Sequence, residues 1–374
     1  MSARMPRCWL GSLGVFGIWG AALGLCTQGC LRPSEERARQ DQEVGSADDG
    51  RMSVEVEGGH AVVRELDTGY VSLWASAPRL RFDVRFLQPP PDELLVSIHN
   101  CMPEAQLTGP VPVLQSGRDA AGVCWFRLGP LAGTEALGLR VEPPDSERVS
   151  PFRFAVMSDV QEAIDGVQDI YDVLNLEPDV DFLLGAGDLT QQGTAEQLER
   201  FQHELESLKI PYYTTLGNHE LGEAPTLYHR YFGRGSQSFA YKGVRFSLID
   251  SASATLDPIV FGWLDDWLTL GADQLHVVAM HVPPLDPIGV RNGAFASRNE
   301  AAKLLARLAA SGVDLTLYGH IHSYYHFDNA GIPAFISGGG GAIPERFDNI
   351  GRHFLVVDAD PLAQSFEVRV VRVD

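Results

Sequence analysis

Short stretches that alternate apolar and polar residues, or run apolar, fill the chain from Met52 to about Glu147. Proline and glycine, which interrupt strands, separate these stretches from one another. There are seven of them: SVEVE, HAVVREL, VSLWA, LRFDVRFL, LLVSIH, VCWFRLG and LGLRVE. Seven short strands over roughly a hundred residues are typical of two packed antiparallel sheets. We therefore predict a small all-β sandwich of immunoglobulin or fibronectin type over residues 52–148.

The pattern changes after the proline-rich segment 142–151, which we interpret as a hinge. Apolar runs now alternate with stretches that have helical periodicity, including RNEAAKLLARLAAS at 298–311. Such alternation predicts an α/β domain with buried strands over residues 151–374. A hairpin around Lys242-Gly243 and closing strands from residue 353 onward add antiparallel pairs, so we expect a mixed sheet or two stacked sheets.

The first 30 residues have a different character from the rest of the chain. Arg4 and Arg7 precede the apolar run CWLGSLGVFGIWGAALGLC, which is typical of an export signal. The following CTQGC resembles a bacterial lipoprotein processing site, so residues 1–30 are predicted to be a signal peptide with lipid attachment at Cys30. Plain secretion or an uncleaved anchor is the alternative. We expect an exported protein of the cell envelope or periplasm, anchored to a membrane by lipid.

Residues 31–51 are polar and lack apolar periodicity, which predicts a disordered tether.

Charge and cysteine content narrow the choice of partners. The 374 residues carry a formal net charge of −20, which repels polyanions and makes nucleic-acid binding an unfavoured function. An anionic substrate would then need local positive charge, such as metal ions. Cys101 and Cys124 are the cysteines of the β-rich segment. In an exported protein they can form a disulfide, and two buried thiols are the alternative.

Polar residues with chemical potential follow five of the apolar strands in the second half of the chain. They are Asp159, Asp188, Asn218 with His219, His281, and His320 with His322. Ligand sites in open α/β sheets lie outside the carboxyl ends of the strands, so we expect these side chains to meet in one site. One such histidine alone would more often be structural, but five strand ends together favour a site.

The chemistry of this set points to metal ions. Aspartate, asparagine and histidine are ligands of Mn, Fe, Zn or Co, and the count suffices for two ions. A Ser or Cys nucleophile motif and a phosphate-binding glycine loop of the GxxxxGK[ST] type are both missing from the sequence. Two neighbouring ions can hold a phosphoryl group and activate water. Their positive charge would also allow an anionic substrate to bind to this acidic chain.

The order of the motifs is similar to that of a known family, the calcineurin-like metallophosphoesterases. The matching segments are SDVQ at 158–161, GDLTQQG at 187–193, GNHE at 217–220, MHVPP at 280–284 and GHIH at 319–322. The resemblance covers about 151–374 and implies a four-layer αββα fold. Some relatives of purple acid phosphatase type carry a similar β-sandwich in front of this domain.

The resemblance also implies a role for each motif residue. Asp159 and His322 would hold the first ion, and Asp188 would bridge both ions. The second ion would be held by Asn218, His281 and His320. His219 would contact the substrate, either to orient a phosphoryl oxygen or to protonate the leaving alkoxide.

The activity that the resemblance implies is hydrolysis of phosphomonoesters or phosphodiesters by a hydroxide held between two metal ions. Small molecules, nucleotides or lipid headgroups are the expected substrates. The alternative is a non-catalytic envelope lipoprotein that keeps a degenerate form of the fold for binding.

Gln161 is the position that departs from the family pattern, which usually has histidine there. Gln161 can bind the first ion through its oxygen, which suits Mn or Mg, or act through a bound water. The third alternative is loss of the first ion. Arg291 and Asn292 are further candidates for contact with substrate phosphate, and a solvated loop is the competing interpretation.

Overall fold

The computed structural model describes residues 33–222, 224, 226–289, 293–345 and 350–373. Its six α-helices in these ranges are α1 (Pro33–Glu43), α2 (Gln168–Leu174), α3 (Ala195–Glu204), α4 (Leu227–Tyr231), α5 (Pro258–Leu270) and α6 (Arg298–Ala310). None of the helices within the described ranges combines the length and the apolar character needed to cross a bilayer.

Two five-stranded sheets in the first part of the chain share one hydrophobic core. The first sheet has the order β1-β2-β5-β10-β7, and its strands are Ser46–Asp48 (β1), Met52–Val56 (β2), Leu80–Phe86 (β5), Ala136–Glu142 (β10) and Gln106–Thr108 (β7). The second has the order β3-β4-β6-β9-β8, with strands Ala61–Asp67 (β3), Tyr70–Ala75 (β4), Leu94–His99 (β6), Cys124–Leu128 (β9) and Val113–Arg118 (β8). A disulfide joins Cys101 to Cys124.

Each of the seven stretches expected to be strands coincides with one of these strands, and the sequence pattern missed three others. The missed strands are β1, β7 and β8. Strand β8 pairs only along one side, with β9, and its residues are largely exposed. A strand without a buried face has no alternation of apolar and polar residues, so the pattern could not reveal it.

The expectation of a disordered tether over 31–51 is wrong for residues 33–48. Residues 33–43 form helix α1, and residues 46–48 pair with β2 as strand β1. Arg37 and Asp41 of α1 are each only 1% exposed and bind polar partners far along the chain. These contacts are polar and long-range, so they leave no apolar periodicity in the sequence.

Two further sheets build the second part of the chain. One has the order β13-β12-β11-β20-β21, with strands Tyr212–Thr214 (β13), Val180–Gly185 (β12), Phe152–Met157 (β11), His353–Asp360 (β20) and Ser365–Arg372 (β21). The other has the order β14-β15-β16-β17-β19-β18, with strands Gln237–Tyr241 (β14), Val244–Ile249 (β15), Leu275–Met280 (β16), Leu315–Tyr318 (β17), Ile332–Ser337 (β19) and Tyr324–Asn329 (β18).

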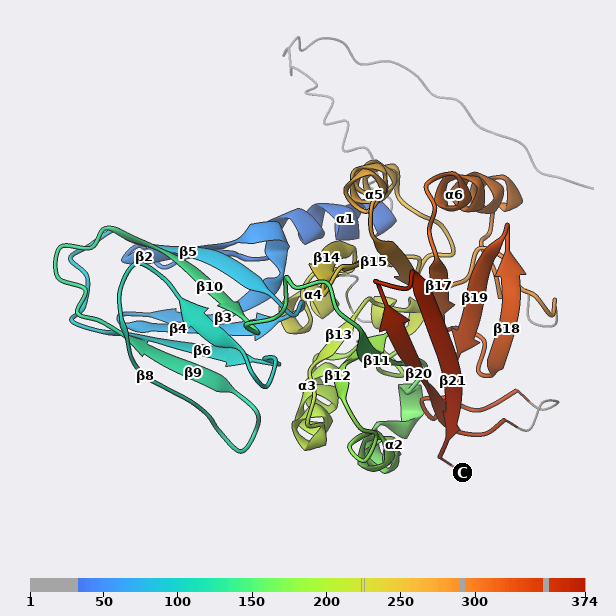
Figure 1. The fold of residues 1–374 in the computed structure, drawn as a ribbon, viewed down its shortest axis with the longest axis horizontal. Coiled ribbons are helices and arrows are strands. Elements are labelled where there is room, and N and C mark those ends of the chain that lie inside the picture. The colour runs from blue at the N-terminus through green and yellow to red at the C-terminus, as the bar shows by residue number, and fades with distance from the viewer. Residues whose placement is uncertain (1–32, 223, 225, 290–292, 346–349, 374) are drawn as a thin grey trace, which may run out of the picture. The chain divides into compact units, whose positions relative to one another are not determined.

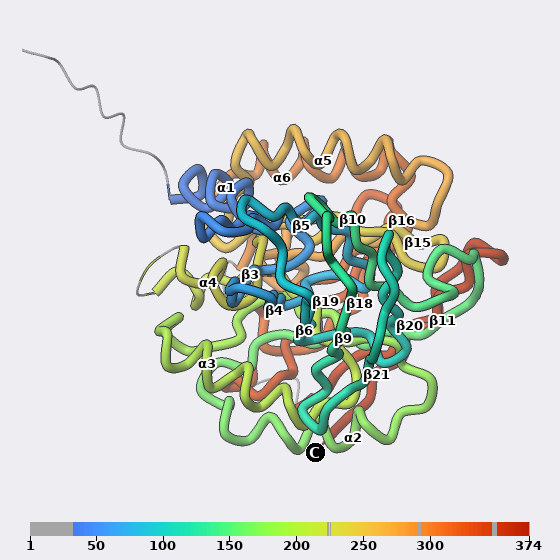
Figure 2. Tube along the Cα trace, turned by 90° about the vertical axis from the view of Figure 1, so that its left-hand side faces the viewer, coloured from blue at the N-terminus to red at the C-terminus, as the bar shows by residue number. Residues whose placement is uncertain are grey.

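Three apolar cores hold these sheets in layers. Between the two sheets, alternate residues such as Phe154, Phe182 and Phe246 pack in one cluster with close ring contacts. On the outer face of the β11 sheet, α2 and α3 bury a second cluster, and α5 and α6 bury a third on the β16 sheet. The layer order is thus helix, sheet, sheet, helix, with α5 and α6 at the top and α2 and α3 at the bottom of Figures 1 and 2.

Parallel pairing brings the functional strand ends to one edge. Strands β11, β12 and β13 are parallel neighbours in one sheet, and β15, β16 and β17 in the other. Their carboxyl ends therefore open onto the same side, where the loops after each strand can meet across the two sheets.

We predict that buried His276 makes unfolding sensitive to acid. His276 is 1% exposed, lies 2.8 Å from the Ser247 hydroxyl through Nε2, and burial lowers its pKa to about 4. The unfolded chain protonates this histidine near its ordinary pKa of about 6.5, so stability falls as the pH drops from 6.5 toward 4. At pH 5 the difference between the folded and unfolded pKa of His276 lowers the free energy of unfolding by about 2 kcal/mol.

The measurement is urea unfolding at pH 7 and pH 5 of wild type and His276→Gln. We expect the variant to lose about 2 kcal/mol less than wild type between these pH values. The exposed His203 provides the matched control, since His203→Gln should keep the wild-type dependence. Equal losses in wild type and His276→Gln would contradict the prediction.

Candidate metal centre

Four residues of the site have left-handed backbone conformations although none is glycine. They are Asp159 (φ 63°), Gln161 (φ 49°), Asp188 (φ 54°) and His320 (φ 70°). Such conformations cost free energy and cluster at functional sites, where the surrounding structure enforces them. Here they turn the chain sharply just after β11, β12 and β17, so that the side chains point back over the strand ends.

Glycines before two of the motif residues permit this close approach. A Cβ added at Gly217 would collide with the Asp188 carboxylate, and one at Gly319 would collide with Ser158 and the Asp159 carboxylate. Glycine is therefore needed at both positions for the carboxylates to lie against the neighbouring loops.

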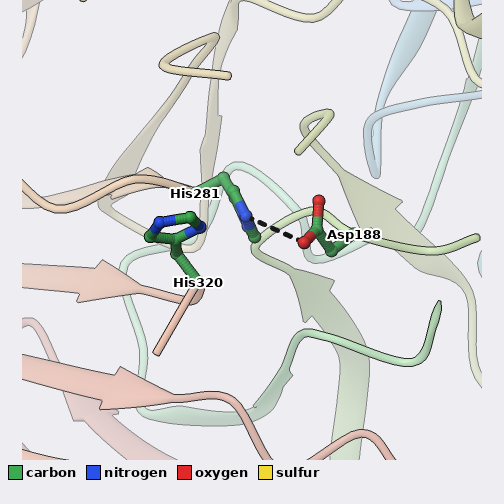
Figure 3. Close-up of side chains that lie close together, drawn as sticks. All are labelled: Asp188, His281 and His320. Carbon is green, nitrogen blue, oxygen red and sulfur yellow. Dashed lines mark ion pairs between the residues drawn. The ribbon is translucent and has the colours of Figure 1, made fainter. Parts of the chain in front are cut away.

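One half of the site consists of Asp188, His281 and His320, shown in Figure 3. Each of the three offers a ligand atom, and these atoms lie within 4.8 Å of one another. The Nε2 atom of His281 lies 3.2 Å from Asp188 Oδ2 and 3.0 Å from Asn218 Oδ1. The residues predicted to hold the second ion thus lie around one point, and we call them the second half-site.

The other half of the site consists of Asp159, Asp188 and His322, whose ligand atoms also lie within 4.8 Å of one another. His322 Nε2 is 3.5 Å from Asp159 Oδ1. The backbone N–H of His320 donates to both Asp159 oxygens, at 3.2 and 3.0 Å. Asp188 belongs to both halves, as a bridging ligand must. We call this group the first half-site.

Gln161 reaches into the first half-site. Its side chain is buried, and its Nε2 donates to Asp188 Oδ2 at 2.8 Å and contacts His322 Nε2 at 3.1 Å. Rotation of the amide by half a turn would present Oε1 to the same place. Gln161 is thus positioned either to bind an ion through oxygen or to donate to the carboxylate and imidazole that bind it.

The histidine rings are oriented by carbonyl groups behind them. His281 Nδ1 donates to the Ala186 carbonyl and His322 Nδ1 to the Ile343 carbonyl, both at 2.8 Å. Since a carbonyl can only accept, Nδ1 carries the hydrogen and Nε2 faces the site in both rings. This is the usual arrangement of metal-binding histidines.

The electrostatics of the site favour a cation at Asp188. Burial opposes protonation of His281, but the carboxylates of Asp188 and Asp159 outweigh it and raise its pKa to about 9. Burial by itself would raise the pKa of Asp188, but His281 and His219 lower it below its ordinary value. The pKa of Asp159 is raised, first by burial. The pair of buried carboxylates thus holds a proton on His281, in the place that a metal ion would take.

The donor set fits two divalent ions. Two compact groups of carboxylate and imidazole donors share one carboxylate, and the rings already present Nε2. Such mixed oxygen and nitrogen donors suit Mn, Fe or Zn.

Residues 152–324 match the calcineurin-like phosphoesterase family. All predicted metal ligands lie within this segment. The match supports the expected class of activity, a hydrolase acting on phosphoester bonds.

Individual proteins also resemble parts of the chain, among them a phosphodiesterase and a phosphatase. A 3',5'-cyclic-nucleotide phosphodiesterase of Nostoc sp. (strain PCC 7120) is 30% identical over 160 residues, which cover 40% of this chain and 59% of that protein. The chain thus matches less than two thirds of the length of this relative. A purple acid phosphatase, PPD1, from yellow lupin (Lupinus luteus) superposes with a TM-score of 0.52 and 15% identity, over 81% of this chain and 79% of that one. This second likeness concerns the fold.

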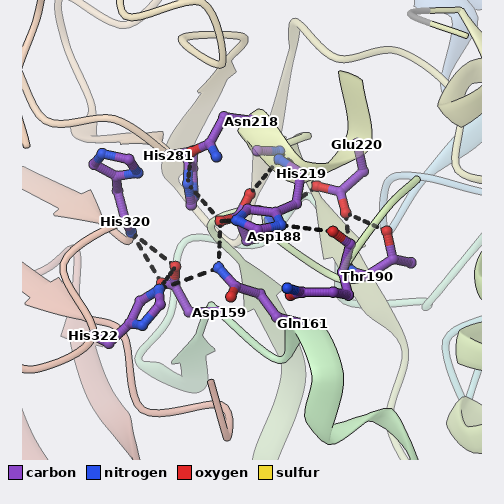
Figure 4. A network of polar contacts seen from close by, with 12 residues as sticks. Asp159, Gln161, Asp188, Thr190, Asn218, His219, Glu220, His281, His320 and His322 are labelled. Atoms are coloured by element: carbon purple, nitrogen blue, oxygen red, sulfur yellow. Dashed lines mark hydrogen bonds and ion pairs between the residues drawn. The ribbon is translucent and has the colours of Figure 1, made fainter. Parts of the chain in front are cut away.

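Glu220 is a residue of the site that the sequence did not explain. It is 1% exposed and accepts hydrogen bonds from the backbone N–H groups of Asp188, Thr190 and Gly217, at 2.8 to 3.0 Å. Its carboxylate therefore ties the loop after β12 to the loop after β13 (Figure 4). Burial, followed by the charge of Asp188, raises its pKa to about 7. The only signal in the sequence is its place beside Asn218-His219.

His219 lies at the edge of the site and is not among the groups of clustered donors. Its backbone N–H donates to Asp188 Oδ1 at 2.9 Å, and its Nδ1 donates to the Gln191 carbonyl at 2.7 Å. Its Nε2 is 3.8 Å from Asp188 Oδ2. Three other candidates, Cys30, Arg291 and Asn292, lie outside the described residues.

We predict that metal binding becomes tighter as the pH rises. An ion must displace the proton of His281, whose pKa is about 9, so apparent affinity should rise up to about tenfold per pH unit below that value. Titration of metal-free protein with Mn²⁺ at pH 6, 7 and 8 measures this. His281→Gln, which has no proton to displace at this position, should bind more weakly and with a smaller slope. Equal slopes would contradict the role of His281.

Replacement of Gln161 by histidine should shift metal preference toward Zn or Fe, because imidazole replaces an amide at the first half-site. Competition between Mn²⁺ and Zn²⁺ for Gln161→His, read by metal analysis, measures the shift. Gln42 on the exposed side of α1 supplies a control for an added histidine, as Gln42→His. An unchanged preference in Gln161→His would show that position 161 does not face the ion.

Proposed function

We propose that the protein is a metal-dependent phosphoesterase that hydrolyses phosphomonoesters or phosphodiesters at a two-metal site. The observation that carries this proposal is the sharing of Asp188 between two groups of clustered donors. Two ions bound there would neutralise charge on the phosphoryl group and activate water for attack on phosphorus. The family match over residues 152–324 supports the same reaction class.

The protein's own residues supply orientation and proton transfer. The hydrogen bond from Nδ1 to the Gln191 carbonyl fixes the ring of His219, with Nε2 toward the site. In this orientation His219, when protonated, can donate from Nε2 to a phosphoryl oxygen or to the leaving oxygen of the ester. An open pocket of about 470 Å³, lined by Gln191, Gln192, Thr194, Asn218, His219 and Gly222, adjoins this ring and can hold the leaving group.

The substrate is expected to be a phosphate ester of a small molecule, a nucleotide or a lipid headgroup. The Nostoc relative is named for cyclic nucleotides, which makes cyclic phosphodiesters the first compounds to test. The acidic chain, with a net charge of −20, disfavours nucleic acid as substrate.

We further propose that the chain is exported and attached to a membrane through lipid on Cys30. The charged start, the apolar run and the CTQGC segment support this. Partition of wild type and Cys30→Ser between membrane and soluble fractions tests this proposal. We expect wild type in the membrane fraction and the variant in the soluble fraction.

We also infer that residues 52–148 form a separate sandwich domain of immunoglobulin or fibronectin type. The two sheets that share one hydrophobic core support this inference.

The test of the activity combines metal analysis with a panel of nitrophenyl monoesters, diesters and cyclic nucleotides. We expect about two ions per chain in wild type, and loss of activity by orders of magnitude in Asp188→Ala because both half-sites lose a ligand. Asp172→Ala, on the exposed side of α2, is the matched control and should remain active. A wild type that binds no metal and hydrolyses none of the esters would support the non-catalytic alternative.

A further inference from the structure

Helix α1 buries two charged side chains that the proposed reaction does not use. Arg37 and Asp41 are each 1% exposed, although α1 lies before the first sheet in the chain. In Figures 1 and 2 the helix lies beside α5 of the second part of the chain. Arg37 binds the loop that follows β15, and Asp41 binds α4 and the segment between α4 and β14.

The first connection runs from Arg37 toward His281. Arg37 donates to both oxygens of Asp250, from Nε at 2.6 Å and from Nη2 at 3.2 Å, and also to Ser253 Oγ at 3.0 Å. Asp250 begins the loop after β15. The next residue, Ser251, accepts from the N–H of Val282 at 2.8 Å and donates to its carbonyl at 3.1 Å. Val282 directly follows His281, so Arg37 fixes the loop that holds this ligand in place.

The second connection runs from Asp41 toward Asn218. Asp41 accepts from the backbone N–H groups of Gly235 at 2.7 Å and Ser236 at 3.0 Å, and lies 2.9 Å from His229 Nε2. The carbonyl of Gly235 accepts from Thr215 Oγ1 at 2.7 Å. Thr215 belongs to the segment between β13 and Asn218, so Asp41 fixes the support of this second ligand.

The two connections meet at both ends. Ser236 Oγ accepts from the N–H of Asp250 at 3.1 Å, which joins the loops that Arg37 and Asp41 hold. At the site, Asn218 Oδ1 and His281 Nε2 are 3.0 Å apart. The first half-site has other supports, namely Ser158 against Asp159 and the Ile343 carbonyl behind His322.

We propose that Arg37 and Asp41 are positioning residues for the second half-site, so that helix α1 sets the affinity for the second ion. This inference rests on the proposed two-metal function. Helix α1 is far from the proposed metal ligands in sequence. The proposal gives it a role in assembling the second half-site and none in assembling the first. Groups that orient metal ligands typically change metal affinity by about 10- to 100-fold when they are replaced.

The probe is Mn²⁺ alone, titrated into metal-free full-length chain and followed by metal content at each free concentration. We expect Arg37→Met to weaken binding of the second ion at least about tenfold. Its affinity for the first ion should stay within about twofold of the wild-type affinity. Asn218→Ala shows which step of the curve belongs to the second half-site. Arg39→Met is the matched control, because Arg39 is on the same helix, 57% exposed, and pairs with Glu35 within it.

A second variant separates positioning from loss of folding. Arg37→Met combined with Asp250→Leu removes both charges of the buried pair, which avoids an unpaired buried charge. We expect this double variant to fold, as judged by its circular dichroism spectrum, and still to bind the second ion weakly. Arg37→Lys keeps a charge but not the forked geometry, and should recover part of the affinity.

Several results would overturn the proposal. These are unchanged binding of both ions in Arg37→Met, equal weakening of both ions, an equal effect of Arg39→Met, or failure of every Arg37 variant to fold. Since Mn²⁺ binding needs no turnover, a wild type that binds two ions and hydrolyses no ester would overturn the proposed function alone. A wild type that binds fewer than two ions would overturn both.

Discussion

Both halves of the candidate metal centre depend on the contacts of the Asp188 carboxylate. It is 1% exposed and is contacted by the Gln161 amide, the His219 backbone and His281. Burial of a charge without partners is unfavourable, so these contacts are what permits an ionised carboxylate between the two sheets. Because its oxygens face both groups of donors, any displacement of Asp188 changes both half-sites together.

The position of Asp188 depends in turn on strained loops and on the sheets beneath them. Left-handed conformations at non-glycine residues cost of the order of 1–3 kcal/mol each, and the site has four of them. The hydrogen bonds that Glu220 accepts from the loops after β12 and β13 help to offset this cost. The aromatic core around Phe154, Phe182 and Phe246 keeps the two sheets, and hence the two sets of loops, at a fixed separation.

The sequence predicted those parts of the molecule that depend on local pattern. Apolar strands followed by a polar residue revealed β11, β12, β16 and β17, and with them Asp159, Asp188, His281 and His320. Features that depend on partners distant in sequence were missed. Glu220 accepts hydrogen bonds from N–H groups some 30 residues away as well as from that of Gly217, and the buried charges of α1 bind partners some 200 residues away. Polar contacts of this kind have no period that a sequence pattern can show.

The buried ion pair of Arg37 and Asp250 restricts the conformation of the loop after β15 more than it stabilises the fold. A pair of this kind often contributes little net stability, since the cost of removing both charges from water is close to the gain from their attraction. Apolar side chains of similar size would fill the same space, but they would allow several arrangements of the loop after β15. The forked guanidinium allows one, because both of its bonds to Asp250 must form together. The loop after β15 binds the backbone of Val282 through Ser251, so a single arrangement of this loop also restricts the position of the neighbouring His281.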